Sequence, residues 1–264
     1  MFTVFQIPFM QKALIVSLIS GAFLSFLGVY IVLRRIVFVG IALSQITACG
    51  FAFGFLLGIN PFICSVIFTL IGVIFFSARQ TEIKIPHEAI IGLAYALASS
   101  LVILFIAKSA QAETHILNLL SGNILTVTNS QVYITLTIFS LALVCHYLFY
   151  KQFIFVSFDP ETANTSGINT KLWDFIFYLL LGIVISTSIM TSGVILTFGY
   201  MVIPPVGALI LVKNLKKTFF VSVIFGLIAS FSGLYLSFIL DLPSGPTIVA
   251  VLCILLGLSW LIKK

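Results

Sequence analysis

The sequence predicts an all-α, polytopic integral membrane protein with eight or nine transmembrane helices and one short helix outside the bilayer. Of its 264 residues, 61% are hydrophobic and only 8% are charged, and the mean hydropathy is +1.27. These values lie far outside the range of soluble globular domains. One crossing takes about 20 apolar residues, so almost no extramembrane domain fits. We therefore expect residues 1–264 to form a single membrane domain, with soluble chemistry supplied by other chains.

Nine apolar runs of span length follow one another along the chain. They cover residues 12–33, 39–58, 61–78, 89–107, 131–150, 172–192, 194–212, 218–240 and 246–262. The first run lacks an evident small-residue cleavage site and is followed at once by Arg34 and Arg35, so we expect a retained span and not a signal peptide. Small residues recur within the spans, as at Ser17 and Gly21, and permit close helix packing.

The seventh run is interrupted by residues that disfavour a continuous helix. Pro204 and Pro205 each remove a backbone donor, so a kink or break is expected near them. In a bilayer such a break is tolerated only where protein or a water-filled cavity covers it. The two prolines are therefore candidate pathway residues, and a count of eight crossings is also compatible with the sequence.

The positive charges indicate an orientation. With nine crossings and the amino terminus outside, eleven of the thirteen Lys and Arg residues fall on the cytoplasmic side. They are Arg34, Arg35, Arg79, Lys84, Lys151, Lys171, Lys213, Lys216, Lys217, Lys263 and Lys264. Only Lys12 and Lys108 remain outside, as the positive-inside rule predicts, and the carboxyl terminus is then cytoplasmic. Membrane topology thus explains the net charge of +6 without a nucleic-acid partner.

The polar segment FDPETANTSG stands between two strongly apolar runs and falls in the cytoplasm in this orientation. Asp159 can serve as an N-cap, Pro160 suits the first helical position, and Glu161 suits the positive start of a helix. Gly167 is a natural stop. The pattern predicts a helix of about two turns. Such a helix is too short to be stable alone in water, so neighbouring apolar segments or a partner protein must hold it.

The sequence lacks the signatures of an enzyme. His87 and Glu88 begin an HExxH-like pattern, but Ile91 stands where the second histidine of a zinc protease is needed. No Gly-x-x-x-x-Gly-Lys-[Ser/Thr] loop and no Gly-x-Ser-x-Gly elbow is present. No charged residue lies deep in a span, and His146 is expected to be packed or interfacial. Energy for any transport would therefore have to come from a partner, and we expect no cofactor bound by this chain.

Uncharged polar groups concentrate in the second apolar run. Ser44, Gln45, Thr47 and Cys49 lie close together, and Gln45 and Cys49 are four residues apart, so they share a helix face. These groups could line a translocation pathway or form hydrogen bonds between helices. Both interpretations stay open from the sequence alone.

Several segments together resemble the ABC-transporter permeases that import zinc, manganese or iron. The segment at Arg34 to Gly58 is similar to that family's RR-x-x-F-x-G-D-A-L-S-H-A pattern. Five further segments match in the same order: HEAIIGLAYALA, SGNILTV, FDPETANTSG, LTFGYMVIPPVGALIL and DLPSGPTIV. The resemblance covers nearly the whole chain.

The resemblance implies a multi-pass protein of the bacterial plasma membrane, in contact with membrane lipid. It implies a dimer with a second permease copy or a paralogue, cytoplasmic ATP-binding subunits, and an extracytoplasmic metal-binding protein that delivers the cargo. The segment Asp159–Gly167 would be the coupling helix that inserts into the ATPase, with Asp159, Pro160, Glu161, Ala163 and Gly167 as its coupling residues. The metal is substrate, not a resident cofactor.

The sequence departs from the family pattern where metal ligands are expected. Ile41 and Gln45 stand at positions where the family has Asp and His. Isoleucine cannot ligate, and a glutamine amide is a weak ligand for zinc or manganese. Cys49 replaces a common proline and could supply a soft ligand, so Gln45 and Cys49 are the candidate metal ligands. The chain could be one half of a heterodimer, carry a different metal, or use its partner's ligands.

The main hypothesis is a non-enzymatic permease subunit of an ATP-driven importer for divalent zinc, manganese or iron. Its candidate pathway residues are Ser44, Gln45, Cys49, Pro204 and Pro205. A permease for a chelated metal, such as a siderophore or cobalamin, is the first alternative, although such chains usually need more spans. An ion-driven carrier or channel is the second, and it would usually need charged groups within the spans.

Overall fold

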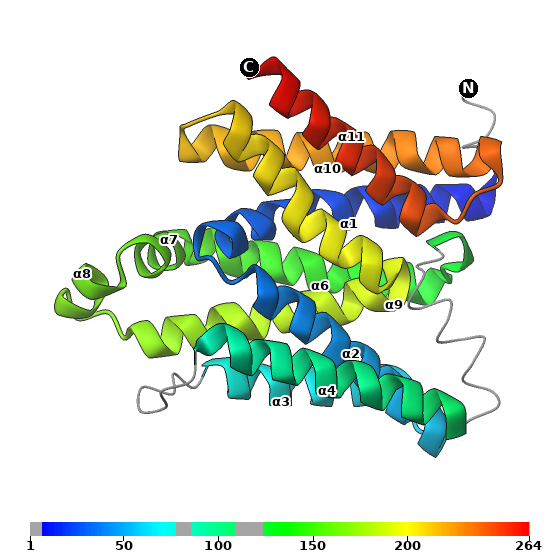
Figure 1. The fold of residues 1–264 in the computed structure, drawn as a ribbon, viewed down its shortest axis with the longest axis horizontal. Helices are drawn as coiled ribbons and strands as arrows, with labels where there is room; N and C mark the ends of the chain where they lie inside the picture. The colour runs from blue at the N-terminus through cyan, green and yellow to red at the C-terminus, as the bar shows by residue number, and fades with distance from the viewer. Residues whose placement is uncertain (1–6, 78–85, 109–123, 264) are drawn as a thin grey trace. The chain divides into compact units, whose positions relative to one another are not determined.

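The structure is a computed structural model that describes residues 7–77, 86–108 and 124–263. Within these ranges the chain is helical with short connections and contains no strand (Figure 1). The elements are α1 (Pro8–Leu33), α2 (Val37–Leu57), α3 (Pro61–Ser77), α4 (His87–Lys108), the short 3₁₀ helix η2 (Ile124–Thr126), α6 (Asn129–Leu148), α7 (Tyr150–Phe158), α8 (Pro160–Thr165), α9 (Thr170–Leu211), α10 (Leu215–Leu240) and α11 (Ser244–Ile262).

Seven of the described helices are long and apolar enough to cross a membrane, namely α1, α2, α4, α6, α9, α10 and α11. The apolar helix α3 is slightly shorter, with 17 residues. Helix α9 has 42 residues, which would extend about 63 Å if straight, twice the hydrocarbon thickness of a bilayer. It is interrupted at Gly193, which divides it into two stretches of span length. The predicted all-α, polytopic membrane fold is confirmed.

The position of the interruption differs from the sequence-based expectation. Gly193 has φ 79° and ψ 170°, whereas Pro204 and Pro205 lie inside the helix that follows. The helix is therefore not broken at the prolines, and the break lies eleven residues earlier, at Gly193. Pro205 leaves the carbonyl of Met201 without its usual helical donor, and Gly28 of α1 packs against that carbonyl and the Pro205 ring. Only a residue without a side chain permits this approach, so close packing accommodates the prolines without a break.

The chain divides into two compact units, each described by itself. The first comprises Met1–Val32, Leu117–Phe139 and Thr187–Lys264. In it α1 and α10 cross where Gly21 faces Gly226, and a side chain on either glycine would collide with the other helix. The Tyr200 hydroxyl lies 3.1 Å from Ser17 Oγ and 2.5 Å from Ser230 Oγ. Small residues and satisfied hydroxyls thus hold this unit together, as is usual in membranes.

The second unit comprises Leu33–Ile116 and Ser140–Ser186. Helix α2 packs on both α3 and α4. The Thr69 hydroxyl lies 2.7 Å from Thr47 Oγ1 and 2.9 Å from Ser186 Oγ, which links α3 to α2 and to the first stretch of α9. This unit contains all of α7 and α8, which form the bend of the chain between α6 and α9 (Figure 1). The predicted coupling segment and the candidate pathway residues of α2, Ser44, Gln45 and Cys49, therefore belong to one compact unit.

Candidate coupling and pathway sites

The start of α8 is fixed by its own sequence. The Asp159 carboxylate accepts a hydrogen bond from the backbone N–H of Thr162 at 3.0 Å, and Pro160 occupies the first turn. This is the N-cap arrangement, in which a side chain satisfies a backbone donor that the helix leaves unpaired. The same hydrogen bonding to Thr162 lowers the pKa of Asp159 below its usual value. The predicted cap is confirmed.

The end of α8 is fixed equally well. Gly167 has a φ of 83°, in the left-handed region. The N–H of Ile168 donates to the Ala163 carbonyl at 3.0 Å, and the N–H of Gly167 donates to the Asn164 carbonyl at 3.1 Å. This pair of bonds is a Schellman motif, in which glycine avoids the strain of positive φ. The helix therefore has six residues and defined caps at both ends.

Helix α8 presents a polar surface. Glu161, Thr162, Asn164 and Thr165 are exposed, whereas Ala163 is 0% exposed. In this structure the Ala163 side chain anchors the helix to its own chain, and the other four side chains are available for contact. A helix of this length depends on such anchoring because its internal hydrogen bonds do not stabilise it alone.

Aromatic rings connect the two helices on either side of α8. The Trp173 ring of α9 lies 5.0 Å from the Phe149 ring and 5.6 Å from the Phe153 ring of α7, between ring centroids. His146 is buried and stacks on Phe153 at 4.6 Å, which agrees with the packed role expected from the sequence. Such rings bury a large apolar area. These aromatic contacts therefore hold α7 and the start of α9 together on either side of α8.

Arg34 forms an ion pair with Asp174 near the start of α9. One of its terminal nitrogens lies 2.8 Å from Asp174 Oδ1, and the two side chains are only 8% and 16% exposed. Its Nε donates to the Ser157 hydroxyl at 2.7 Å, and its guanidinium lies 4.2 Å from the centre of the Phe177 ring. The sequence indicated Arg34 as a topological charge and as part of the family-like RR segment, but not as a partner in an ion pair. Its partners could not be identified because they are 123 and 140 residues away.

The candidate pathway residues of α2 occupy different surroundings. Ser44 is buried, and its hydroxyl donates to the Gly40 carbonyl one turn back at 2.9 Å. Such back-bonding makes a hydroxyl inexpensive in an apolar helix. Gln45 is half-buried, and its side-chain amide forms no hydrogen bond with the residues that the structure describes. Of the two, Gln45 keeps its hydrogen-bonding groups available to another molecule.

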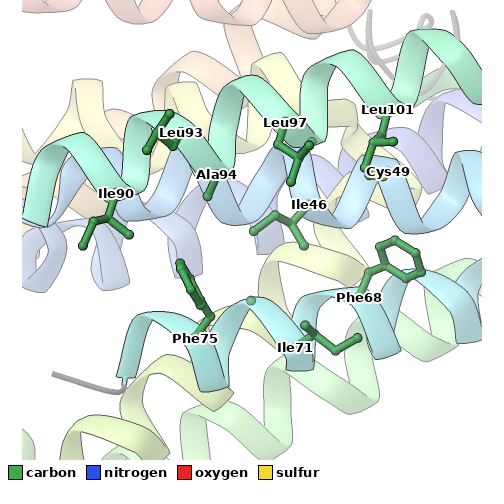
Figure 2. A pocket seen from close by; sticks show the side chains of 12 residues that line it. Ile46, Cys49, Phe68, Ile71, Phe75, Ile90, Leu93, Ala94, Leu97 and Leu101 are labelled. Atoms are coloured by element: carbon green, nitrogen blue, oxygen red, sulfur yellow. The ribbon is translucent and has the colours of Figure 1, made fainter. Parts of the chain in front are cut away.

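Cys49 is 2% exposed and borders an apolar cavity of about 600 Å³ between α2, α3 and α4. Figure 2 shows Ile46, Phe68, Leu97 and other apolar side chains around it. Within residues 7–77, 86–108 and 124–263, no three His, Cys, Asp or Glu side chains are grouped as a metal site would require. The neighbourhood of the Cys49 thiol is that of a packed residue.

Pro204 and Pro205 belong to the other compact unit and are both buried. Gly28 lies against Pro205, as described above, so the immediate environment of that proline is helix packing. The five candidate pathway residues are thus distributed between the two units, with Ser44, Gln45 and Cys49 in the second.

Comparison with known proteins connects this architecture to a family. The model of the ABC 3 transport family matches residues 6–263. The chain is 31% identical to the manganese transport system membrane protein MntC of Listeria monocytogenes serovar 1/2a, over 97% of this chain and 91% of that protein. It is 29% identical to the manganese import system permease protein ScaB of Streptococcus gordonii, over 96% and 91% of the two chains.

A solved structure gives the same result. A chain of PsaBC from Streptococcus pneumoniae in complex with Fab superposes with a TM-score of 0.88 at 28% identity, over 98% of this chain and 94% of that one. A relative in Haemophilus influenzae, 27% identical over 97% of this chain and 91% of that protein, is named a probable iron transport system membrane protein. The family match and the helical architecture agree along nearly the whole sequence. This multi-pass membrane protein belongs to the ABC 3 transport family.

Proposed function

We propose that this chain is the permease subunit of an ATP-driven importer for a divalent transition metal, and that α8 docks on a separate cytoplasmic ATPase. The observation that carries the proposal is α8 itself, a doubly capped helix with four exposed polar side chains on an aromatic base. Membership in a transport family and the relatives named for manganese and iron support the metal class. The metal is the substrate, ATP is hydrolysed by the partner, and this chain holds no cofactor.

The proposed assembly has three further components. A second permease copy or a paralogue completes the pathway, an extracytoplasmic metal-binding protein delivers the ion, and lipid surrounds the spans. A half-buried amide in an apolar helix favours an additional hydrogen-bond partner. Gln45 therefore supports a pathway or dimer contact on its face of α2. Gln45 and Cys49 are the metal-contacting candidates of this chain, with the remaining ligands supplied by the second subunit.

Energy transfer follows from the position of α8. ATP binding draws two ATPase subunits together, and their movement displaces residues 159–167. The bend carries this displacement into α7 and α9 through the aromatic contacts at Trp173. The packed spans then exchange between two arrangements, as is general for alternating access.

The test reverses charge on the exposed face of α8. Glu161→Lys combined with Asn164→Arg changes two exposed side chains and spares the buried Ala163. We expect ATPase co-purification and ATP-dependent Mn²⁺ uptake into proteoliposomes to fall about tenfold, since misplaced charges at a docking surface are strongly disfavoured. Glu88→Lys, a charge reversal at an exposed residue of α4, is the matched control and should retain both activities. Unchanged association and uptake in the α8 variant would refute the docking role.

The same proteoliposomes separate the alternative functions. Zinc, manganese and iron are compared as free ions to identify the preferred metal. Uptake only of a siderophore or cobalamin chelate would indicate a permease for chelated metal. Uptake that proceeds without the ATPase would indicate an ion-driven carrier.

A further inference from the structure

Arg34 occupies a position from which it contacts both sides of the bend that carries α8. It lies in the turn between α1 and α2, three residues before α2 begins at Val37. Ser157, its partner in α7, stands two residues before the N-cap Asp159. Asp174, its partner in α9, lies shortly after that helix begins at Thr170. One side chain thus joins the segment that enters α8, the segment that leaves it, and the start of the helix bearing Gln45.

The contacts of Arg34 are directional. The Ser157 hydroxyl accepts from Arg34 Nε at 2.7 Å and donates to the Phe153 carbonyl, so it links Arg34 to the backbone of α7. The terminal nitrogen of Arg34 donates to Asp174 at 2.8 Å. A guanidinium is planar and carries its donors in a fixed fork. Ser157 Oγ and Asp174 Oδ1 bind different edges of this planar group, so the guanidinium fixes the distance between them.

The surroundings make this connection stiff. Arg34 is only 8% exposed and packs on the Phe177 ring at 4.2 Å. A buried ion pair tolerates little displacement, because separation leaves charges without compensation in a medium of low dielectric constant. Arg35, the next residue, is exposed, and no described contact involves its side chain. The two arginines of this turn thus differ completely in environment.

We propose that Arg34 is a positioning residue that makes α7, α9 and the start of α2 move as one body when α8 is displaced. Its contact with Ser157 is the connection between the docking helix and the pathway helix. The inference rests on the proposed function, because it assumes that α8 receives the movement of an ATPase. All of these residues lie within the second compact unit.

The experiment measures the number of Mn²⁺ ions taken up per ATP hydrolysed, using the complete reconstituted transporter. Arg34→Lys keeps a cation near Asp174 but loses the fork, and Ser157→Ala removes the acceptor in α7 together with its hydrogen bond to the Phe153 carbonyl. For each variant we expect this ratio to fall about tenfold, the factor that corresponds to one charge-assisted hydrogen bond, while ATP hydrolysis per assembled complex is retained. Arg35→Lys, the same change one residue later, should leave the ratio unaltered.

A double variant gives the decisive result. If the hydrogen bond from Arg34 to Ser157 is the connection, Ser157→Ala should cause no further loss in the Arg34→Lys background, because both changes remove the same bond. Additive losses would overturn the proposal, and so would a normal ratio in either single variant. A proportional fall in ATP hydrolysis and uptake per complex would assign Arg34 a merely structural role. The α8 charge reversal, run in parallel, shows separately whether the docking role itself fails.

Discussion

Asp159 shows how one carboxylate sets the boundary of a short helix. Its side chain receives the Thr162 N–H at 3.0 Å, and the peptide bond to Pro160 restricts the backbone that follows. Both effects act within four residues, so they could be inferred from the sequence. The side chain is exposed, which means that its role is local order and not core packing.

Removing this cap should weaken docking without preventing folding. Asp159→Ala deprives the Thr162 N–H of its partner, so the first turn of α8 frays, and we expect affinity for the ATPase to fall about three- to tenfold. Asp159→Asn can still accept the hydrogen bond and should retain most of the affinity. Hydrogen exchange at the Thr162 amide would show the fraying directly. Equal exchange in the wild-type and alanine proteins would contradict this role.

The pH dependence of the cap follows from the lowered pKa of Asp159. A depressed pKa in the folded state means that the ionised cap stabilises α8 above the unfolded-state pKa, and that this contribution is lost as pH falls through the lower folded value. An unperturbed aspartate titrates at about pH 4. Asp159 therefore stays ionised between about pH 6 and 8, and its titration should not change the docking affinity in that range. NMR titration of the Asp159 carboxyl should give a midpoint below the ordinary value. A midpoint above that value would contradict the cap.

At the scale of elements, α9 shows why helix breakers must be read in context. The helix is interrupted at Gly193, with φ 79° and ψ 170°, and continues through two prolines. That backbone region is essentially restricted to glycine. The carbonyl that Pro205 leaves free faces Gly28 of α1 in tight packing. A sequence argument gives the prolines more weight because the packing of another helix is not visible in it.

Gly193→Ala should destabilise the protein. A side chain at this backbone conformation costs about 1–3 kcal/mol, and the melting temperature of the detergent-solubilised protein should fall by several degrees. Gly257→Ala in α11 is the matched control, since a methyl group there meets no atom within 4 Å. It should be neutral or slightly stabilising because alanine favours helix. Equal melting temperatures for the two variants would show that the backbone conformation at position 193 does not require glycine.

At the scale of the whole molecule, the charge distribution leads to a prediction of orientation. The positive-inside rule predicts that the α8 segment lies in the cytoplasm and that the start of α6 lies outside. A Cys253→Ser background removes the exposed cysteine, and the others are buried or half-buried. Asn164→Cys and Ser130→Cys then add thiols at exposed positions on opposite predicted sides.

A membrane-impermeant maleimide should label Asn164→Cys only in inside-out vesicles and Ser130→Cys only in right-side-out vesicles. The two variants serve as controls for each other, because each vesicle type must label one of them. The reverse pattern would invert the topology and exclude a cytoplasmic partner for α8. Labelling of both variants in the same vesicle type would contradict the prediction that the chain crosses the membrane once between positions 130 and 164.

The sequence by itself determined the membrane class, the apolar spans, and both ends of α8, because hydropathy and helix capping depend on neighbouring residues. Tertiary structure decided what surrounds each candidate residue. It joined Arg34 to Ser157 and Asp174 across 123 and 140 positions. It also buried Ala163, placed Cys49 beside an apolar cavity and moved the break in α9 to Gly193. These outcomes depend on contacts between distant helices, and no local pattern records which helices will pack together.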